Sequence, residues 1–518
     1  MNSRSIAVLA CALLLAVPLP TASAPRDDKG NVLRALASRV GRVLGAAAAC
    51  PDVARQRVKG ISDKITDVIK TSAGNEDEGS SILDVFHKSQ SDGAQSVTAK
   101  KVDCASADRE LSDLEAASAP SPQISNAPQA PAQTMALPGP GTAGALRGIT
   151  DSEIRFGISA PFSGPSKDLG HQMRLGIETA FRLVNDAGGV NGRALRLVTA
   201  DDGYEPSRTG DTMKQLYEKD QVFGFVGNVG TPTAMVAAPF ALERRMLFFG
   251  AFTGASVLRH DPPDRYVFNY RASYAEETDA VVRYLVKVRR LKPEQIAVFA
   301  QQDAFGDAGF AGVSKAMRTL RGGDGGFILR VGYPRNTLDV DTAIAQVRAN
   351  KTPIKAVVMV ATYRAAAKFI EKTRDSIPGL IYTNVSFVGS TSLRDELMLL
   401  GPKYATGVIV TQVVPAVDGY SSLILEYKSA LAKYFGGEAP DYVSFEGYVA
   451  AQVLIEALKR AGPQLDTEKV VNALENLRDF DMGLGAMISF GKSEHQGSHK
   501  VWGTQLSESG KYEAFELQ

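Results

Sequence analysis

Residues 154–199 read IRFGISAPFSGPSKDLGHQMRLGIETAFRLVNDAGGVNGRALRLVT, and the change of pattern within them decides the fold class. Residues 154–159 form an apolar, partly β-branched run that predicts a buried strand. The next stretch predicts a helix with one apolar face, formed by Met173, Ile177, Phe181 and Val184. Gly188 and Gly189 end this helix, and residues 195–199 repeat the strand pattern. A strand, a helix and a second strand in this order predict a parallel sheet with a crossover helix.

The same rhythm continues along the rest of the chain. Further strands are predicted at residues 222–227, 247–250, 296–300, 327–331, 356–361, 386–389 and 407–414. These runs are apolar almost throughout, as strands are when helices cover both faces of a parallel sheet. They are too numerous for one sheet of ordinary size. We therefore expect residues 148–518 to form two doubly wound α/β lobes, each with a parallel sheet, joined by a hinge.

Length and charge narrow the class of protein. A chain of 518 residues exceeds one ordinary hydrophobic core, so at least two domains are expected. The 58 lysines and arginines balance 57 aspartates and glutamates, and the charges are mixed along the chain. No basic face that would follow a phosphate backbone is predicted, which argues against nucleic acid as a partner.

Residues 1–24 have the features of an export signal. Arg4 supplies a positive start, residues 6–17 are apolar, and the Ala-Ser-Ala triplet at 22–24 offers a cleavage site. The apolar run is too short to span a bilayer. Cys11 follows a Leu-Ala pair as a lipidated cysteine would, but too little apolar sequence precedes it. We expect a soluble protein that is secreted across the inner membrane to the periplasm and carries no lipid anchor.

Residues 25–115 predict a small helical domain. Its apolar residues recur at helical spacing, at Val58, Ile61, Ile65, Val68, Ile69, Cys104, Ala107, Leu111 and Leu114. Once the signal is removed, Cys50 and Cys104 are the remaining cysteines, and in an oxidising compartment this pair predicts a disulfide. Two buried free thiols are the alternative. Residues 116–147 contain six prolines and no charge before their last residue, so we expect a partly extended linker.

The sequence carries no motif of a common cofactor or nucleophile. It has no phosphate-binding loop and no nucleophile elbow, and Gly483 and Gly485 lack the third glycine of a dinucleotide fingerprint. We therefore expect no cofactor and no catalytic residue. His495 and His499 have the spacing of a metal-binding pair, but Gly497 between them disfavours a helix that would bring both to one face. Polar surface residues are expected here, with a metal site as the alternative.

Seven short motifs keep one order and one place relative to the predicted strands. They are APFSGP at 160–165, GGVNGR at 188–193, DD at 201–202, GNVGTPT at 227–233, FTGA at 252–255, DAFG at 303–306 and GY at 447–448. Together they resemble the branched-chain amino-acid (leucine, isoleucine and valine) binding proteins of ABC transporters, which have a type I periplasmic binding fold. The resemblance covers residues 150–518 and nothing before them.

The resemblance implies an extracytoplasmic solute-binding protein of an ABC importer. Such a protein closes two lobes around a small molecule, here an amino acid or a related carboxylate or amide, and then docks on a membrane permease. A ligand-sensing receptor domain that acts through a partner protein is an alternative with the same fold. An enzyme of the doubly wound class is a further alternative, but it would require convergent acid, base or nucleophile groups that no motif indicates.

Residues that follow the predicted strands are candidates for ligand contact, because doubly wound sheets bind ligands at the carboxyl ends of their strands. Thr231, followed by a proline, predicts a helix start whose free amides attract an anion; the alternative is a plain helix cap. Thr253, Gly254 and Ala255 are small enough for backbone donors to approach a ligand, and a tight turn is their alternative role. Tyr363 opens a helix directly after a strand.

Further candidates follow other strands, and for each an ordinary loop role is the alternative. They are Ser163, Tyr204, Tyr274, Asp303 and Phe305. Where the resembled family has an acidic residue for the ligand's ammonium group, this chain has Ser390 in a neutral Gly-Ser-Thr-Ser run. An amino-acid ligand would need Asp303 or Glu446 in that role. Otherwise the ligand is a carboxylate, an amide or an aromatic acid.

Overall fold

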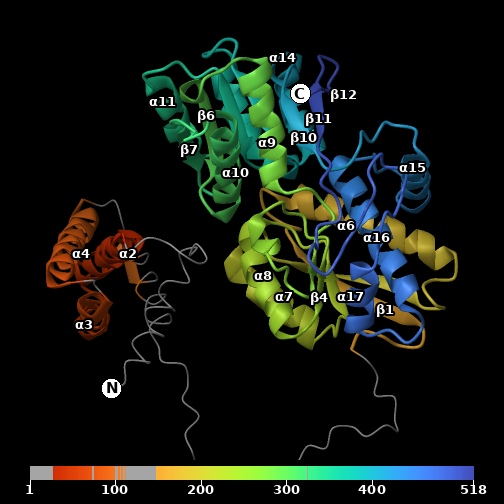
Figure 1. Cartoon of the computed structure of the whole chain (residues 1–518), viewed down its shortest axis with the longest axis horizontal. Coiled ribbons are helices and arrows are strands. Elements are labelled where there is room, and N and C mark those ends of the chain that lie inside the picture. Colours follow the sequence, from red (N-terminus) through yellow and green to blue (C-terminus); the bar gives the residue numbers. More distant parts are fainter. Residues whose placement is uncertain are drawn as a thin grey trace, which may run out of the picture. The chain divides into compact units, whose positions relative to one another are not determined.

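The computed structural model describes residues 27–72, 75–99, 103, 104, 107, 108, 111, 147–323 and 325–517. The chain divides into two compact units, Met1–Leu137 and Pro138–Gln518. The first unit holds the red and orange helices of Figure 1, and the second holds both sheets. The predicted export signal, Cys11 and the predicted linker up to residue 146 lie outside the described residues, so these features stay predictions.

The first unit contains the helices predicted for it. They are α2 (Asp27–Ala48), α3 (Arg55–Ser72) and α4 (Glu76–Thr98). Helices α2 and α4 pack closely because glycines face the neighbouring backbone: a Cβ on Gly45 would lie 1.9 Å from the carbonyl oxygen of Gln90. Cys50 and Cys104 form the predicted disulfide.

Apolar side chains form the core of this helical unit as predicted. The buried members of the predicted set are Ile61, Ile65, Ile69, Ala107 and Leu111. Val58 and Cys104 are partly buried and pack against the same core. Leu114 and the side chain of Val68 lie outside what the structure describes.

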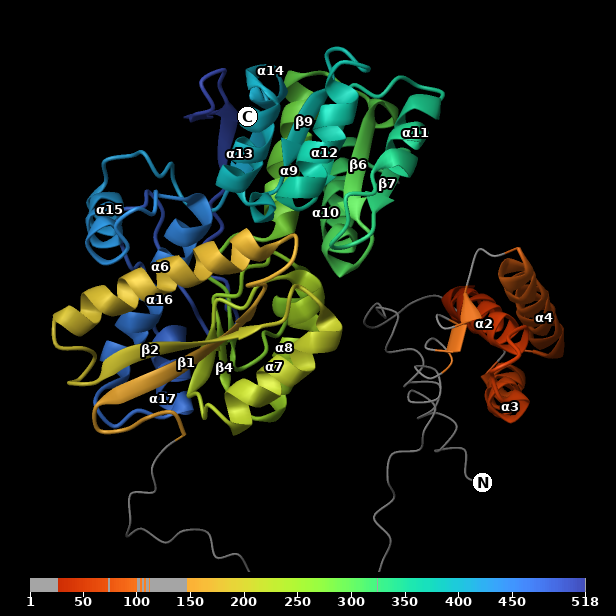
Figure 2. The ribbon, with the colours of Figure 1, turned by 180° about the vertical axis from the view of Figure 1, so that it is seen from behind.

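The first lobe of the second unit is built on five parallel strands in the order β2-β1-β3-β4-β5. They are β1 (Glu153–Ala160), β2 (Ala194–Asp201), β3 (Gly224–Val226), β4 (Leu247–Phe249) and β5 (Val267–Phe268). The connections contain α6 (Lys167–Asp186), α7 (Pro206–Glu218), α8 (Thr231–Glu243) and the 3-10 turn η1 (Ser256–Leu258). Three later helices return to this lobe, namely α15 (Ser422–Tyr434), α16 (Tyr442–Ala461) and α17 (Thr467–Glu475). Figure 2 shows α16 lying along α6.

The second lobe contains seven strands in the order β12-β11-β10-β9-β8-β6-β7. They are β6 (Ile296–Gln301), β7 (Leu329–Tyr333), β8 (Ala356–Val360), β9 (Ile381–Asn384), β10 (Ile409–Gln412), β11 (Trp502–Leu506) and β12 (Tyr512–Ala514). The helices are α9 (Tyr274–Arg283), α10 (Ala304–Arg321), α11 (Asp341–Ala349), α12 (Tyr363–Arg374), α13 (Ser390–Leu400) and α14 (Pro402–Ala405). A π-helical turn, η2 (Tyr284–Val288), continues α9, and the 3-10 turn η3 (Pro293–Gln295) precedes β6.

The sheet of this lobe is parallel as predicted from β7 to β10, with an antiparallel addition at one edge, and one predicted strand is wrong. Strand β11 pairs antiparallel with β10, and β12 pairs antiparallel with β11. A short turn joins these two strands, and such a turn can only return the chain antiparallel. Residues 386–389 are not a strand: Ser386–Val388 is the 3-10 turn η4, and Gly389 has a left-handed backbone with φ 78°, which a strand does not have. The strand lies a few residues earlier, at β9.

The chain passes between the lobes after β5, after β10 and before β11, as the two views in Figure 1 and Figure 2 show. These crossings form the hinge region. The other predicted strands of both lobes are present, with bounds that differ by a few residues from the prediction. Nowhere in the described ranges is a helix both long enough and apolar enough to cross a membrane.

Candidate functional site

The loops after β3 and β4 bring two predicted site residues together. The Thr231 and Thr253 hydroxyl oxygens lie 2.7 Å apart, and both side chains are buried. Thr231 is the first residue of α8, and Gly230, with φ 109°, is the N-cap. The prediction that Thr231 itself caps the helix was therefore wrong by one residue, because its side chain points to Thr253 and not back to the helix amides.

Glycines let two tyrosines pack against these loops. A Cβ on Gly230 would lie 2.3 Å from the Tyr204 ring, and one on Gly254 would lie 2.7 Å from the Tyr274 ring and amide nitrogen. The Tyr274 amide also donates to the Gly254 carbonyl oxygen at 2.8 Å. Gly254 is thus explained by close packing of Tyr274. Burial raises the pKa of Tyr274 to about 12, so its hydroxyl stays protonated at neutral pH.

Five rings from both lobes form what we call the interlobe aromatic cluster. Phe387 is its centre, with ring centroids 4.6 Å from Phe305, 5.0 Å from Phe252 and 6.1 Å from Tyr204. Tyr274 completes the cluster, 5.4 Å from Phe305. Tyr204 and Phe252 follow strands of the first sheet, whereas Phe305 and Phe387 follow strands of the second. All five side chains are buried, so the two lobes are in contact in this structure.

Polar contacts join the lobes beside the aromatic cluster. Arg335 donates to Glu205 in the first lobe at 2.9 Å and to Asp303 in the second at 3.1 Å. Asp303 is also the N-cap of α10 and accepts from the Phe305 amide at 3.0 Å. Gln301 donates to the Tyr204 hydroxyl across the cleft at 3.2 Å. Asp303 therefore serves as a cap and an ion-pair partner.

Tyr363 makes another contact between the lobes. It opens α12, as predicted, and its hydroxyl donates to the Pro165 carbonyl oxygen at 2.6 Å. Burial raises its pKa. The α12 start is thereby held against the first loop of the first lobe.

A buried arginine lies at the hinge, where the chain leaves β5. The Arg271 guanidinium is 3.3 Å from the Glu277 carboxylate, bonds to the Ser386 hydroxyl, and lies 3.6 Å from the Glu446 carboxylate. Glu277 also accepts from the Ser386 amide at 2.7 Å and from the Thr411 hydroxyl at 2.5 Å. Burial raises the pKa of Glu446 to about 7, against the opposing effect of Arg271.

Three predicted site residues have their side chains or backbone engaged elsewhere. The Ser163 hydroxyl donates to Asp201 at 2.6 Å on the exposed surface. The Ala255 amide donates to the Thr253 hydroxyl at 3.2 Å. The Ser390 side chain is buried and bonds to Gln412 on β10 at 3.1 Å. Their role in ligand contact stays a prediction.

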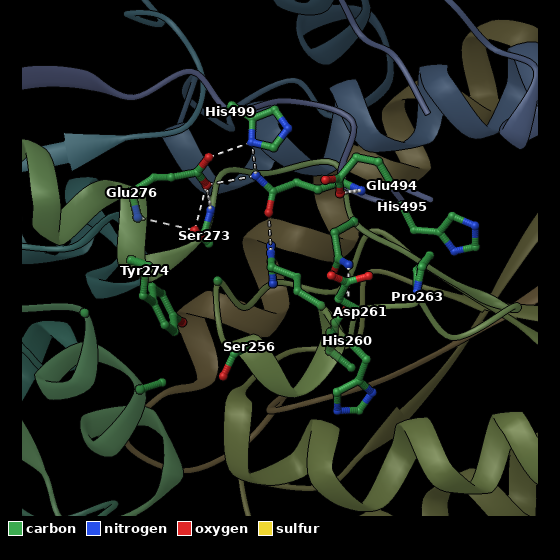
Figure 3. Close-up of a pocket in the computed structure, with 18 of the residues that line it drawn as sticks. Ser256, His260, Asp261, Pro263, Ser273, Tyr274, Glu276, Glu494, His495 and His499 are labelled. Atoms are coloured by element: carbon green, nitrogen blue, oxygen red, sulfur yellow. Dashed lines mark hydrogen bonds and ion pairs between the residues drawn. The ribbon is translucent and has the colours of Figure 1, made fainter. Parts of the chain in front are cut away.

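A pocket of about 720 Å³ lies next to the hinge, and Gly254 and Tyr274 are the predicted site residues that line it (Figure 3). Glu276 in this pocket accepts from the Ser273 amide at 2.6 Å, from Gln496 at 2.8 Å and from His499 at 2.6 Å. Although burial opposes it, these hydrogen bonds lower the pKa of Glu276 to about 2. The same bond with Glu276 raises the pKa of His499.

The two histidines of the suggested metal pair have different environments. His495 is buried, contrary to the prediction of a surface residue, and its ring stacks on Phe268 with centroids 3.8 Å apart. His499 is exposed and bonds to Glu276. Within the described part of the chain, no group of three histidine, cysteine, aspartate or glutamate side chains could hold a metal ion.

Comparison with known proteins agrees with this architecture. Residues 153–511 match the family described as periplasmic binding protein. The chain belongs to this family. Its members are solute-binding proteins, so the two lobes and their cleft serve to hold a small molecule.

Among similar periplasmic binding proteins, a Pseudomonas aeruginosa protein named amino acid binding protein is 25% identical over 60% of this chain and 79% of its own length. The Leu/Ile/Val-binding protein homolog 3 of Brucella melitensis is 24% identical over 65% of this chain and 87% of its own. A crystal structure from Rhodopirellula baltica, described as a possible leucine/isoleucine/valine-binding protein, is 37% identical with a TM-score of 0.67. It covers 73% of this chain and 99% of that chain.

Sequence reasoning missed several residues that hold the lobes of this periplasmic binding protein together. Arg271 and Arg335 follow β5 and β7, but a two-residue strand such as β5 gives too weak a signal to mark the position after it. Phe387 lies within residues 386–389, which were predicted as a strand, so it was not recognised as a residue that follows one. Its position one turn after the true strand, β9, would have placed it at the carboxyl edge.

Proposed function

We propose that this protein is the extracytoplasmic solute-binding component of an ABC importer and binds a small carboxylate by closure of its lobes. Support comes first from the relatives, whose names refer to amino acids or to leucine, isoleucine and valine. The Cys50–Cys104 disulfide supports an oxidising, extracytoplasmic compartment. The resemblance of the sequence motifs to ABC-transporter binding proteins supports a membrane permease as the partner.

The Thr231–Thr253 pair is the observation that carries the carboxylate assignment. Both hydroxyls are buried at the amino end of α8, where helix amides attract negative charge. Each hydroxyl has one proton to donate, and the bond between the two oxygens at 2.7 Å uses one of these protons. The other proton can be donated to a ligand oxygen. Tyr204 and Tyr274 pack against Gly230 and Gly254, which lie in the two loops that carry these threonines. A carboxylate is the ligand group that such neutral donors and a helix start favour.

Truncation of Thr231 to alanine tests this site. We expect affinity for the carboxylate ligand to fall by about 1.5 to 3 kcal/mol, since a hydrogen bond to a charged group is lost. Isothermal calorimetry on the full chain, after a thermal-shift screen of amino acids and carboxylates, measures the change. Thr179→Ala is the matched control, because Thr179 is also buried in the first lobe but bonds within its own helix to Leu175 at 2.7 Å. Equal affinity of Thr231→Ala and the parent would contradict the site.

The transport role has a separate test. Deletion of the gene should slow uptake of the ligand found by calorimetry, and the intact gene should restore uptake. A Thr231→Ala gene should restore it only at higher ligand concentration. Unchanged uptake after deletion would leave a binding protein of another kind, such as a sensor.

A further inference from the structure

The interlobe aromatic cluster contains a flat stack that spans the two lobes. The Phe252 and Phe387 rings are 28° from parallel with centroids 5.0 Å apart, and each belongs to a different lobe. The Arg271 guanidinium lies over the Phe252 ring, 4.8 Å from its centroid. Aromatic faces bury any apolar group, but a flat π-system gains more from them than an aliphatic group of the same area does. A ring that enters as the lobes separate would find aromatic faces on both sides.

The carboxylates described beside this cluster already face an arginine, which reduces what they offer to an ammonium group. Glu205 and Asp303 both accept from Arg335, and Glu277 accepts from Arg271, which also lies 3.6 Å from Glu446. Glu446 in addition has a pKa raised by burial, which disfavours its charged form.

Two further acidic side chains after β2 are also bound. Asp201 accepts from the Phe162 amide at 2.8 Å and from the Ser163 hydroxyl, and Asp202 accepts from the Ser159 hydroxyl and the Tyr204 amide, both at 2.9 Å. A buried ammonium without a carboxylate partner is costly. An α-amino acid therefore lacks the partner that its ammonium group requires.

Donors for an anion are present on the same side of the cluster. Thr231 follows β3 and Thr253 follows β4, and Thr253 is next to Phe252 in the chain. Among the described residues, the Arg271 Nη1 atom is buried and has no hydrogen-bond partner. The site thus combines aromatic faces and anion donors, and each carboxylate named above already faces a hydrogen-bond donor or an arginine.

We propose that the ligand is an aromatic carboxylate without an ammonium group, of the benzoate class. This inference rests on the proposed function, since it assigns a ligand class to the same cleft. The ring stacks between Phe252 of the first lobe and Phe387 of the second. The carboxylate meets the Thr231 and Thr253 hydroxyls at the start of α8.

Calorimetry on the full chain with benzoate, cyclohexanecarboxylate, phenylalanine and leucine tests the ligand class. Benzoate should bind at least tenfold more tightly than phenylalanine, which adds the ammonium group, and more tightly than cyclohexanecarboxylate, which lacks the π-system. Tighter binding of leucine or phenylalanine would overturn the aromatic-acid class and leave the proposed solute-binding function intact. Absence of binding by all four compounds would overturn the ligand class and the carboxylate site together.

The Phe387→Leu variant tests the stack itself. It should remove most of the preference for benzoate over cyclohexanecarboxylate, because leucine fills space but presents no aromatic face. Phe490→Leu is the matched control, since Phe490 is an equally buried aromatic residue that packs on Phe249 and Phe268 inside the first lobe. The ratio of the two affinities is the readout, because a general loss of folding lowers both equally. An unchanged ratio in Phe387→Leu would refute the stack.

Discussion

Replacement of Glu446 by glutamine should stabilise the protein at alkaline pH and leave it unchanged at acid pH. Glu446 is 3% exposed, and burial raises its pKa from a usual value of 4.5 to about 7. The folded state therefore holds this proton more tightly than the unfolded chain does, so stability falls as pH rises from 4.5 to about 7. A tenfold change in proton affinity corresponds to about 1.36 kcal/mol, so the rise of this pKa from 4.5 to about 7 removes about 3 kcal/mol of folding stability at alkaline pH. Glutamine resembles the protonated form and avoids this loss.

Urea denaturation of the full chain at pH 4.5 and pH 8 measures the effect. Trp502 on β11 is the one tryptophan of the sequence, so its fluorescence reports the two-lobed unit. Glu446→Gln should exceed the parent by about 2 to 3 kcal/mol at pH 8 and match it at pH 4.5. Glu456→Gln is the control on the same helix, where the carboxylate forms a partly exposed pair with Arg460 and contributes little. A Glu446→Gln protein that is less stable than the parent at pH 8 would refute the reasoning, because the ion pair with Arg271 would then outweigh burial.

Three more predictions concern the polar contacts and the disulfide. Arg335→Leu removes the contact with Glu205 between the lobes and should weaken ligand binding about fivefold. Lys403→Leu, which breaks the pair with Asp375 within the second lobe, should leave binding unchanged, and calorimetry compares the two variants. NMR titration should give His499 a pKa above 6.5, and Glu276→Gln should return this pKa toward 6.5. The stability that the pair contributes is present below pH 6.5 and should be lost as the pH rises through the pKa of His499 in the folded protein. Reduction of the disulfide, which closes a 54-residue separation, should destabilise the helical unit by about 4 kcal/mol in circular dichroism without moving the Trp502 transition.

The sequence was sufficient for the fold because the decisive signal is local. Apolar runs such as residues 154–159 and 356–361 alternate with amphipathic helices, and β1 and β8 appear there. The strands β5, β11 and β12 escaped prediction and lack this signal. Strand β5 has two residues and β12 has three, whereas β11 reads Trp-Gly-Thr-Gln-Leu, with polar and glycine positions in its middle. Their pairing depends on neighbouring strands more than on their own composition.

Only part of the site could be predicted, for a related reason. The position after a strand predicts that a residue lies at the carboxyl edge of its sheet, and Tyr204, Tyr274 and Phe305 are found in the interlobe aromatic cluster because parallel strands end at one edge. Which side chain stacks on which ring depends on how the two lobes approach. The Phe387 ring packs on Tyr204, and Arg335 donates to Glu205; each of these partners is more than 100 positions away in the chain, and no local pattern encodes such pairs.

The contacts between the lobes differ in strength from one edge of the sheets to the other. Arg335 and Glu205 follow β7 and β2, each at one edge of its sheet, and their side chains are 24% and 36% exposed. Arg271 follows β5 at the opposite edge of the first sheet and is 1% exposed, paired with a fully buried Glu277.

An exposed pair of the first kind contributes about 0 to 1 kcal/mol, whereas separation of the buried pair would leave a charge without a partner at a cost of about 3 to 5 kcal/mol. We therefore expect the lobes to separate most easily at the β2 and β7 edges, with Arg271 near the axis of rotation. Such a motion would open the Phe252–Phe387 stack while the hinge charges stay paired, so we expect a ligand to enter from the side where Arg335 contacts Glu205.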